Sequence, residues 1–232
     1  MESDEKIRAA VLNTRIVRAP KQSLATFGVT NIYYYLVAEA SYNEIIKENE
    51  TVIREGRVIA ERPRIVTPYY LSRIQGFSEE ARKYFEMLMN TYEPDSPGLL
   101  YAYKNEPKEL NIVSDNLVSV LQKLNTQIDN KGDPMASIIQ GEDVLWDVSI
   151  LKFIYEITER SVRENVSQLN QRGLLKMDAS GLPAEARVNI ERLFEQVQKG
   201  EMEPAQLKTE LDRWGVFEEY QDRFFTLFKR TR

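Results

Sequence analysis

The amino-acid sequence predicts an α+β protein, in which a mostly antiparallel sheet with helices is followed by an all-helical part. Up to about residue 130, short runs of β-branched and aromatic residues are interleaved with amphipathic stretches, as in α+β domains. Beyond residue 134, apolar residues recur at three- and four-residue steps, the period of helices. The segment 130–134 reads Asn-Lys-Gly-Asp-Pro, a composition typical of connections. We therefore predict an α+β domain over residues 1–130 and a helical domain over residues 134–232.

The first forty-odd residues predict short elements. Residues 1–10 indicate a frayed or short helical leader, Leu12–Val17 a strand, and the capping-box pattern of Ser41 and Glu44 a short helix through about Lys47. The most β-prone run is 32–37. Since side chains alternate along a strand, it divides into a face with Ile32, Tyr34 and Leu36 and a face with Tyr33, Tyr35 and Val37. The tyrosines either form a stacking platform for bases or sugars or are buried with their hydroxyls at the rim.

The stretch 51–73 predicts a hairpin and a third strand. Its β-prone runs are Thr51–Arg54, Arg57–Glu61 and Arg64–Thr67. Gly56 can adopt a positive φ, so Glu55-Gly56 is interpreted as the tip of the hairpin. The turn type stays open, because a two-residue loop places Arg54 opposite Arg57, whereas a bulged turn pairs Ile53 with Arg57. Like charges opposite each other are unfavourable, which favours the bulge or an anionic partner.

This arginine-rich stretch supplies the candidate ligand-binding residues. They are Arg54, Arg57, Arg62 and Arg64, together with Tyr33 and Tyr35 of the earlier strand. Arginine and tyrosine side chains on one surface suit a phosphate, a carboxylate or nucleic acid. The alternative is a solvated hairpin face whose arginines pair with Glu55, Glu61 and nearby acids, since exposed pairs of this kind are common and weak.

Two helices and a second hairpin follow before residue 130. Ser78 is expected to cap a helix that stops before Pro94. The runs Leu99–Lys104 and Leu110–Val113 predict a hairpin joined through residues 105–107. Ser114 or Asp115 is expected to cap a helix whose apolar face is formed by Leu117, Leu121, Leu124 and Ile128.

The last hundred residues predict helices throughout. A short helix is expected from Pro134 to Gly141, and the apolar steps over 144–169 indicate one long helix or two in tandem. Pro183 and Pro204 are expected to open the next two helices, which end at Gly200 and Gly215. An aromatic stripe over 217–228 marks the last helix. Phe224 and Phe225 are adjacent, so one helix face cannot bury both, and with Phe228 they are the candidate partner-binding residues.

The chain contains neither cysteine nor histidine, and this absence excludes whole classes of function. Disulfides, Cys-ligated zinc, iron–sulfur clusters and His-ligated haem require residues that the chain lacks. Ser-His-Asp and Cys-His catalysis and HExxH metalloprotease sites are excluded on the same ground. Neither GxxxxGK[ST] nor GxGxxG occurs. We therefore predict no cofactor and no metal, and we favour binding over catalysis, with no catalytic residue assigned.

One pattern keeps a hydrolytic function open as the third choice. Pro94-Asp95 followed by Glu106-Pro107-Lys108 matches the PD…ExK arrangement of nucleases, in which two carboxylates hold Mg²⁺ and a lysine helps to activate water. Both halves fall in turn-like segments, and Pro107 would interrupt the strand that carries the triplet. Two solvated turns account for the same residues.

Composition and charge limit which partners and which cellular compartment we expect. No apolar run approaches the roughly 20 residues of a membrane span, and the acidic start of the chain differs from a signal peptide, so we expect a cytoplasmic protein with no membrane contact. Residues 1–73 hold 11 Lys and Arg against 9 Asp and Glu, a net charge of +2, whereas the rest holds 20 against 27, a net charge of −7. The favoured function is a regulatory or scaffolding protein that contacts a protein partner, or forms a homo-oligomer, through its helical half. Nucleic-acid or phosphate-ligand binding is the alternative.

Overall fold

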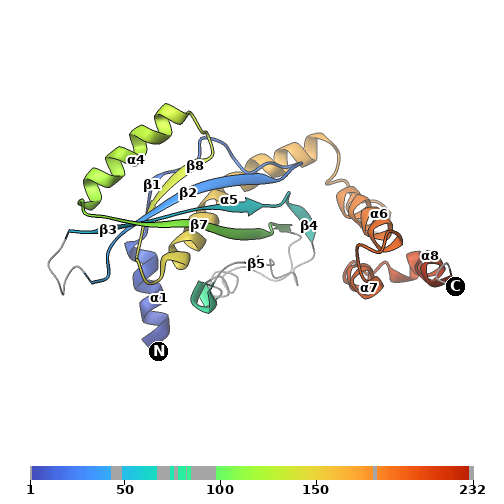
Figure 1. Ribbon diagram of the computed structural model, residues 1–232. Coiled ribbons are helices and arrows are strands. Elements are labelled where there is room, and N and C mark those ends of the chain that lie inside the picture. Colours follow the sequence, from blue (N-terminus) through green and yellow to red (C-terminus); the bar gives the residue numbers. More distant parts are fainter. Residues whose placement is uncertain are drawn as a thin grey trace. The chain divides into compact units, whose positions relative to one another are not determined.

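The structure is a computed structural model that describes residues 2–42, 49–66, 74–75, 78–81, 83–84, 98–179 and 182–229 (Figure 1). The chain divides into two compact units. The first comprises residues 1–63, 71–93 and 101–165, and the second comprises residues 64–70, 94–100 and 166–232. The first unit holds the main sheet, and the second holds the C-terminal helices. The boundary predicted at 130–134 lies inside the first unit.

The main sheet has six strands in the order β1-β8-β2-β3-β7-β5. Their bounds are β1 Arg15–Arg18, β2 Thr30–Glu39, β3 Thr51–Ala60, β5 Ile74–Gln75, β7 Tyr103–Val113 and β8 Ala136–Gln140. The pairs β2–β8 and β5–β7 are parallel and the other three are antiparallel. The predicted α+β class, with a mostly antiparallel sheet and a helical C-terminal half, is confirmed.

The faces of β2 follow the predicted alternation. Ile32, Tyr34 and Leu36 are buried on one face, while Tyr33 and Tyr35 are more accessible on the other. Helix α4 (Leu117–Lys131) covers part of the second face, where its Val120, Leu124 and Ile128 pack against Val37, Ala136 and Ile138. Figure 1 shows α4 on one side of the sheet, and α1 (Glu2–Asn13) and the first part of α5 (Trp146–Gln171) on the other.

The capping residues of α4 explain where the helix begins and ends. Asn116 is the N-cap and accepts a hydrogen bond from the backbone N–H of Ser119 at 2.9 Å, one or two residues later than the predicted caps. Gly132 ends the helix with a φ of 68°, a conformation that favours glycine, and its N–H donates to the carbonyl of Ile128. The chain therefore turns sharply at Gly132 and enters β8 four residues later.

The hairpin predicted at Glu55-Gly56 is wrong. Residues 51–60 form one continuous strand, β3, which pairs with the whole of β2. Gly56 is buried in the middle of β3, directly opposite Tyr34. A glycine between β-prone runs marks either a turn or a place where another group approaches the backbone closely, and here it marks the second.

The second predicted hairpin is also wrong. Leu99 and Leu100 belong to β6 (Gly98–Leu100), which pairs with β4 (Arg64–Val66), while β7 runs unbroken from Tyr103 to Val113. Pro107 lies within β7, opposite Gly56 and beside a shift in the register of the β3–β7 ladder. An irregular ladder tolerates a residue without an N–H, which explains proline inside this strand.

The short helix predicted from Pro134 to Gly141 is wrong as well, because residues 136–140 form β8. This strand lies parallel to β2 and antiparallel to β1. Its first four residues are buried. Strands buried on both faces lose the two-residue alternation that would identify them in a sequence.

The remaining predicted helices are largely confirmed. Ser78 accepts a hydrogen bond from the N–H of Ala81 at 3.2 Å, as expected of a cap, but most of that helix and the helix predicted at 41–47 lie outside the described residues. The apolar steps from Val148 to Leu169 belong to one helix, α5, while Val144 lies in the turn before it. The last three helices are α6 Ala184–Gln198, α7 Pro204–Arg213 and α8 Phe217–Lys229. Gly200 and Gly215 both have positive φ, as predicted for helix ends.

Three buried tyrosines predict a loss of stability at alkaline pH. Burial raises the pKa of Tyr34 to about 12 and also raises the pKa values of Tyr101 and Tyr103. A tyrosine in the unfolded chain has a pKa of about 10. The unfolded state therefore loses its protons first, so this stability is fully present below pH ~10 and is lost as pH rises through the folded pKa values.

We expect the free energy of unfolding to fall by up to about 1.4 kcal/mol per pH unit for each such tyrosine above pH ~10. Urea unfolding between about pH 8 and about pH 11 measures this dependence. The Tyr34→Phe variant should show a shallower fall, because it removes one of the three groups. Equal slopes in the variant and the wild type would contradict the role assigned to Tyr34.

Candidate functional site

A row of three side chains crosses three strands on the face of the sheet that α4 partly covers. Tyr33 of β2 lies opposite Arg57 of β3, and Arg57 lies opposite Glu106 of β7. Directly opposite residues share a face, so the row brings an aromatic ring, a guanidinium group and a carboxylate together. In the neighbouring row, Tyr35 lies opposite Glu55.

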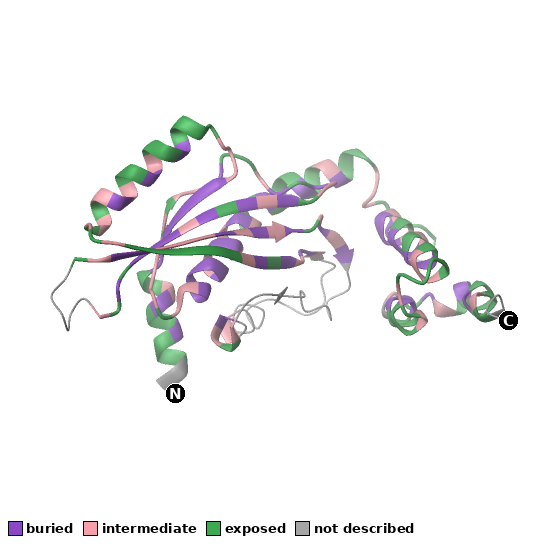
Figure 2. Ribbon diagram, viewed as in Figure 1, coloured by how far each residue is buried: buried purple, intermediate pink, exposed green. Residues whose placement is uncertain are grey.

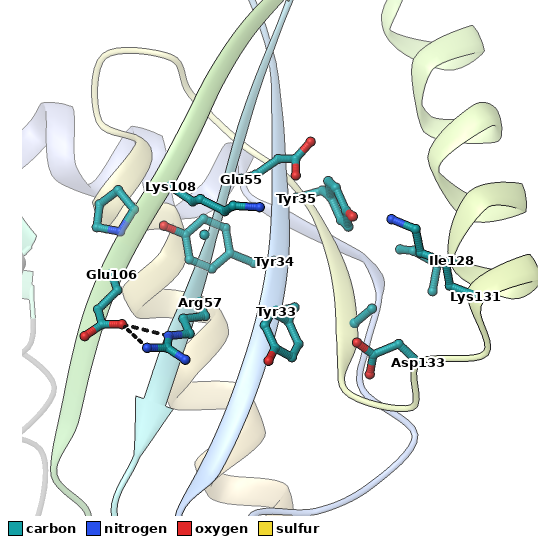
Figure 3. Close-up of a pocket in the computed structure, with 13 residues that line it drawn as sticks. Tyr33, Tyr34, Tyr35, Glu55, Arg57, Glu106, Lys108, Ile128, Lys131 and Asp133 are labelled. Atoms are coloured by element: carbon teal, nitrogen blue, oxygen red, sulfur yellow. Dashed lines mark hydrogen bonds and ion pairs between the residues drawn. The ribbon is translucent and has the colours of Figure 1, made fainter.

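The register shift in the β3–β7 ladder changes the direction of one more side chain. Gly56 pairs with Pro107 and Glu55 pairs with Glu109, which leaves Lys108 as an extra residue in β7. Extra residues of this kind redirect side chains. In Figure 3 the Lys108 side chain reaches from β7 over the sheet, toward the end of α4.

These side chains line a cavity of about 570 Å³ between the sheet and the last turns of α4, which we call the α4 groove. All of its lining residues belong to the first unit. The lining comprises Tyr33, Tyr34, Tyr35, Glu55, Gly56, Arg57, Glu106, Pro107, Lys108, Ile128, Lys131, Asp133 and Ala136. Figure 3 shows Lys108 and Lys131 extending toward each other from opposite sides of the groove.

The charges in the α4 groove are partly neutralised within it. Arg57 donates from Nε to a carboxylate oxygen of Glu106 at 2.7 Å, and its second terminal nitrogen lies 2.7 Å from the same oxygen. The other oxygen of Glu106 lies 2.7 Å from the ammonium group of Lys104. Hydrogen bonds from Lys104 and Arg57 lower the pKa of Glu106, and the bond to Glu106 raises the pKa of Arg57. Glu106 is therefore held as a carboxylate between two cations.

The structure separates the four arginines proposed as a ligand-binding set. Of the six proposed residues, Arg57 lines the α4 groove together with Tyr33 and Tyr35. Arg54 lies on the opposite face of the sheet, where it bonds to Asp143 at 2.9 Å and its guanidinium carbon lies 5.3 Å from the Trp146 ring centroid. Arg62 follows β3 in the first unit, and Arg64 belongs to β4 in the second. The predicted set therefore contributes three of its six residues to one site.

The phenylalanines proposed as a partner-binding set divide between the core and the surface of the second unit. Phe224 is buried in a core formed by α6, α7 and α8. Phe225 is 48% exposed and Phe228 is 51% exposed. We call this exposed pair the α8 edge. Figure 2 shows the burial of each helix along its length, with exposed positions on α8 beside buried ones.

The residues of the PD…ExK pattern do not form a described metal site. Asp95 lies outside the described residues, and Glu106 is bound to Arg57 and Lys104. Among the residues that the structure describes, no group of three or more acidic side chains is arranged to hold a metal ion.

None of the helices in the described ranges is long and apolar enough to cross a membrane.

Sequence reasoning missed the residues that close the α4 groove on its two sides. In the sequence, Lys108 belongs to the PD…ExK pattern, and Lys131 and Asp133 belong to the segment 130–134 that was interpreted as a connection between domains. The sequence did contain one signal for Lys131 and Asp133. Gly132 ends α4, and the buried strand β8 that follows brings residues 131–136 back to the sheet.

Comparison with protein families, curated proteins and solved structures finds no match for this chain.

Proposed function

We propose that the chain is a non-catalytic, cytoplasmic binding protein that contacts another protein molecule through the α8 edge. The contacted molecule is a second copy of the chain or a different protein. The observation that carries the proposal is the exposure of two phenylalanine rings three positions apart on one helix, where they share a face. Aromatic side chains are enriched where protein surfaces bind each other most strongly.

Ring contacts hold the α8 edge in place. The Phe225 ring lies edge-on to Phe217 and Phe224, with centroid distances of 6.5 and 5.8 Å, and the Phe228 ring lies edge-on to Phe224 at 5.5 Å. Phe224 is in turn anchored in the core of the second unit. Rings that are already ordered lose little side-chain freedom when a partner covers them, so more of their burial contributes to affinity.

The Phe225→Asp variant tests the proposal. If the contacted molecule is a second copy, sedimentation velocity should show reversible association of the purified chain, and the variant should associate at least about tenfold more weakly. The matched control is Val188→Asp, which places the same charge at an exposed apolar residue of α6 in the same unit. Circular dichroism should show that both variants keep their helices.

A chain that stays monomeric is then tested for a different partner. A photoreactive phenylalanine analogue at position 225 should crosslink a protein that position 188 does not, and the purified partner should bind the wild type but not Phe225→Asp. A monomeric chain with no crosslink specific to position 225 would overturn the proposal. Equal effects of the two aspartate variants would also overturn it.

A further inference from the structure

The α4 groove has the size and the lining of a site for a small ligand. Its volume of about 570 Å³ lies within the range of roughly 300–1,000 Å³ that is usual for such sites. Ile128 and Ala136 are buried apolar residues of its lining, and six charged residues also line it. We propose that the α4 groove binds a mononucleotide, with the base against Tyr33 and Tyr35 and the phosphate between Lys108 and Lys131.

The two tyrosines provide a surface for a planar ring. They lie two positions apart on β2 and therefore share a face of the sheet. Tyr33 is 43% exposed although it belongs to a central strand, because α4 covers only part of this face. Exposed tyrosine rings stack on nucleobases of any sequence, since every base has a π-face. The base of the ligand is therefore placed beside Tyr33, with Tyr35 deeper in the groove.

The two lysines provide the charge for a phosphate. Lys131 makes no ion pair within the described part of the chain, and the Lys108 ammonium group lies 3.6 Å from Glu109 in an exposed pair, which is a weak interaction. Lys131 also offsets the partial negative charge at the C-terminal end of α4, which would otherwise repel a phosphate. Arg57 is already bound by Glu106, so it has a positioning role beside Tyr33.

The acidic residues of the groove favour a mononucleotide over a nucleic-acid strand. Glu55, Glu106 and Asp133 balance the three basic residues of the lining. Glu55 has no ion pair in the described ranges, and Asp133 uses one oxygen to accept from the N–H of Met135 at 2.8 Å. Free carboxylate oxygens accept hydrogen bonds from ribose hydroxyls and exocyclic amino groups. The same carboxylates would repel the successive phosphates of a nucleic-acid strand.

Isothermal titration calorimetry on the full chain tests the proposal, with AMP, GMP, CMP and UMP as probes. At least one should bind, and its nucleoside should bind about tenfold or more weakly, because it lacks the phosphate. Lys131→Ala and Lys108→Ala should each weaken binding about fivefold or more. Tyr33→Ala should weaken it by a similar factor, whereas Tyr33→Phe keeps the ring and should bind nearly as the wild type does.

Two controls separate this site from general charge and from the α8 edge. Lys199→Ala removes the same charge from an exposed residue at the end of α6, and Phe225→Asp alters the proposed partner surface, so both should bind the nucleotide as the wild type does. Absence of binding by all four nucleotides would overturn the proposal. So would equal binding of nucleotide and nucleoside, an unchanged affinity in both groove lysine variants, or binding of a single-stranded oligonucleotide alone.

Discussion

Replacing Gly56 by alanine is expected to lower the free energy of unfolding of the first unit by about 3 kcal/mol. An added Cβ would lie 2.6 Å from Cζ of Tyr34, 2.8 Å from the backbone oxygen of Glu106, and closer still to the Tyr34 hydroxyl. Carbon atoms do not approach one another this closely, so the Tyr34 ring or β7 must move. The hydroxyl of Tyr34 donates to the side-chain oxygen of Asn105 at 3.0 Å in a buried position, and that bond would be strained or lost.

The matched control for this variant is Gly28→Ala. A Cβ added at Gly28 would have no atom within 4 Å, and Gly28 has no positive φ, so the same added methyl group should change stability little. Trp146 lies in the first unit and Trp214 in the second, and these are the two tryptophans of the chain. Urea unfolding followed by Trp146 fluorescence, in a Trp214→Phe background, measures both variants. Equal stability of Gly56→Ala and Gly28→Ala would contradict the close approach of Tyr34.

Replacing Phe194 by alanine is expected to lower the free energy of unfolding of the second unit by about 3–5 kcal/mol. Phe194 is fully buried in the core that α6, α7 and α8 share. Its ring stacks on Tyr220 with a centroid distance of 5.6 Å, and the guanidinium carbon of Arg223 lies 4.1 Å from its centroid. Removing the ring leaves a cavity between α6 and α8 and takes both contacts away.

Phe228→Ala is the matched control, because it removes the same ring from a position that is half exposed. This variant should lower the free energy of unfolding by about 1 kcal/mol or less. Trp214 fluorescence in a Trp146→Phe background reports on the second unit, where Trp214 packs against the core. If the two variants were equally stable, the core assigned to these three helices would be wrong.

Parts of the candidate sites followed from the sequence. The alternation along 32–37 placed Tyr33 and Tyr35 on one face, and the adjacency of Phe224 and Phe225 required one ring to leave the core. The sequence also grouped Arg57 with these two tyrosines as candidate ligand-binding residues, and the three residues line the α4 groove. Lys108, Lys131 and Asp133 were not predicted to lie there, because their approach depends on a bulge in β7 and on the turn after α4.

The sequence by itself determined where α6 and α7 end, and it excluded chemistry that requires cysteine or histidine. A helix period, a proline at the start of a helix and a glycine past its end act within a few residues, so Gly200 and Gly215 were placed correctly. Only the tertiary structure revealed that Gly56 makes room for the Tyr34 side chain and that residues 136–140 form a strand. Both depend on groups distant in the chain, Tyr34 against Gly56 and β2 beside β8, and no local pattern encodes such a neighbour.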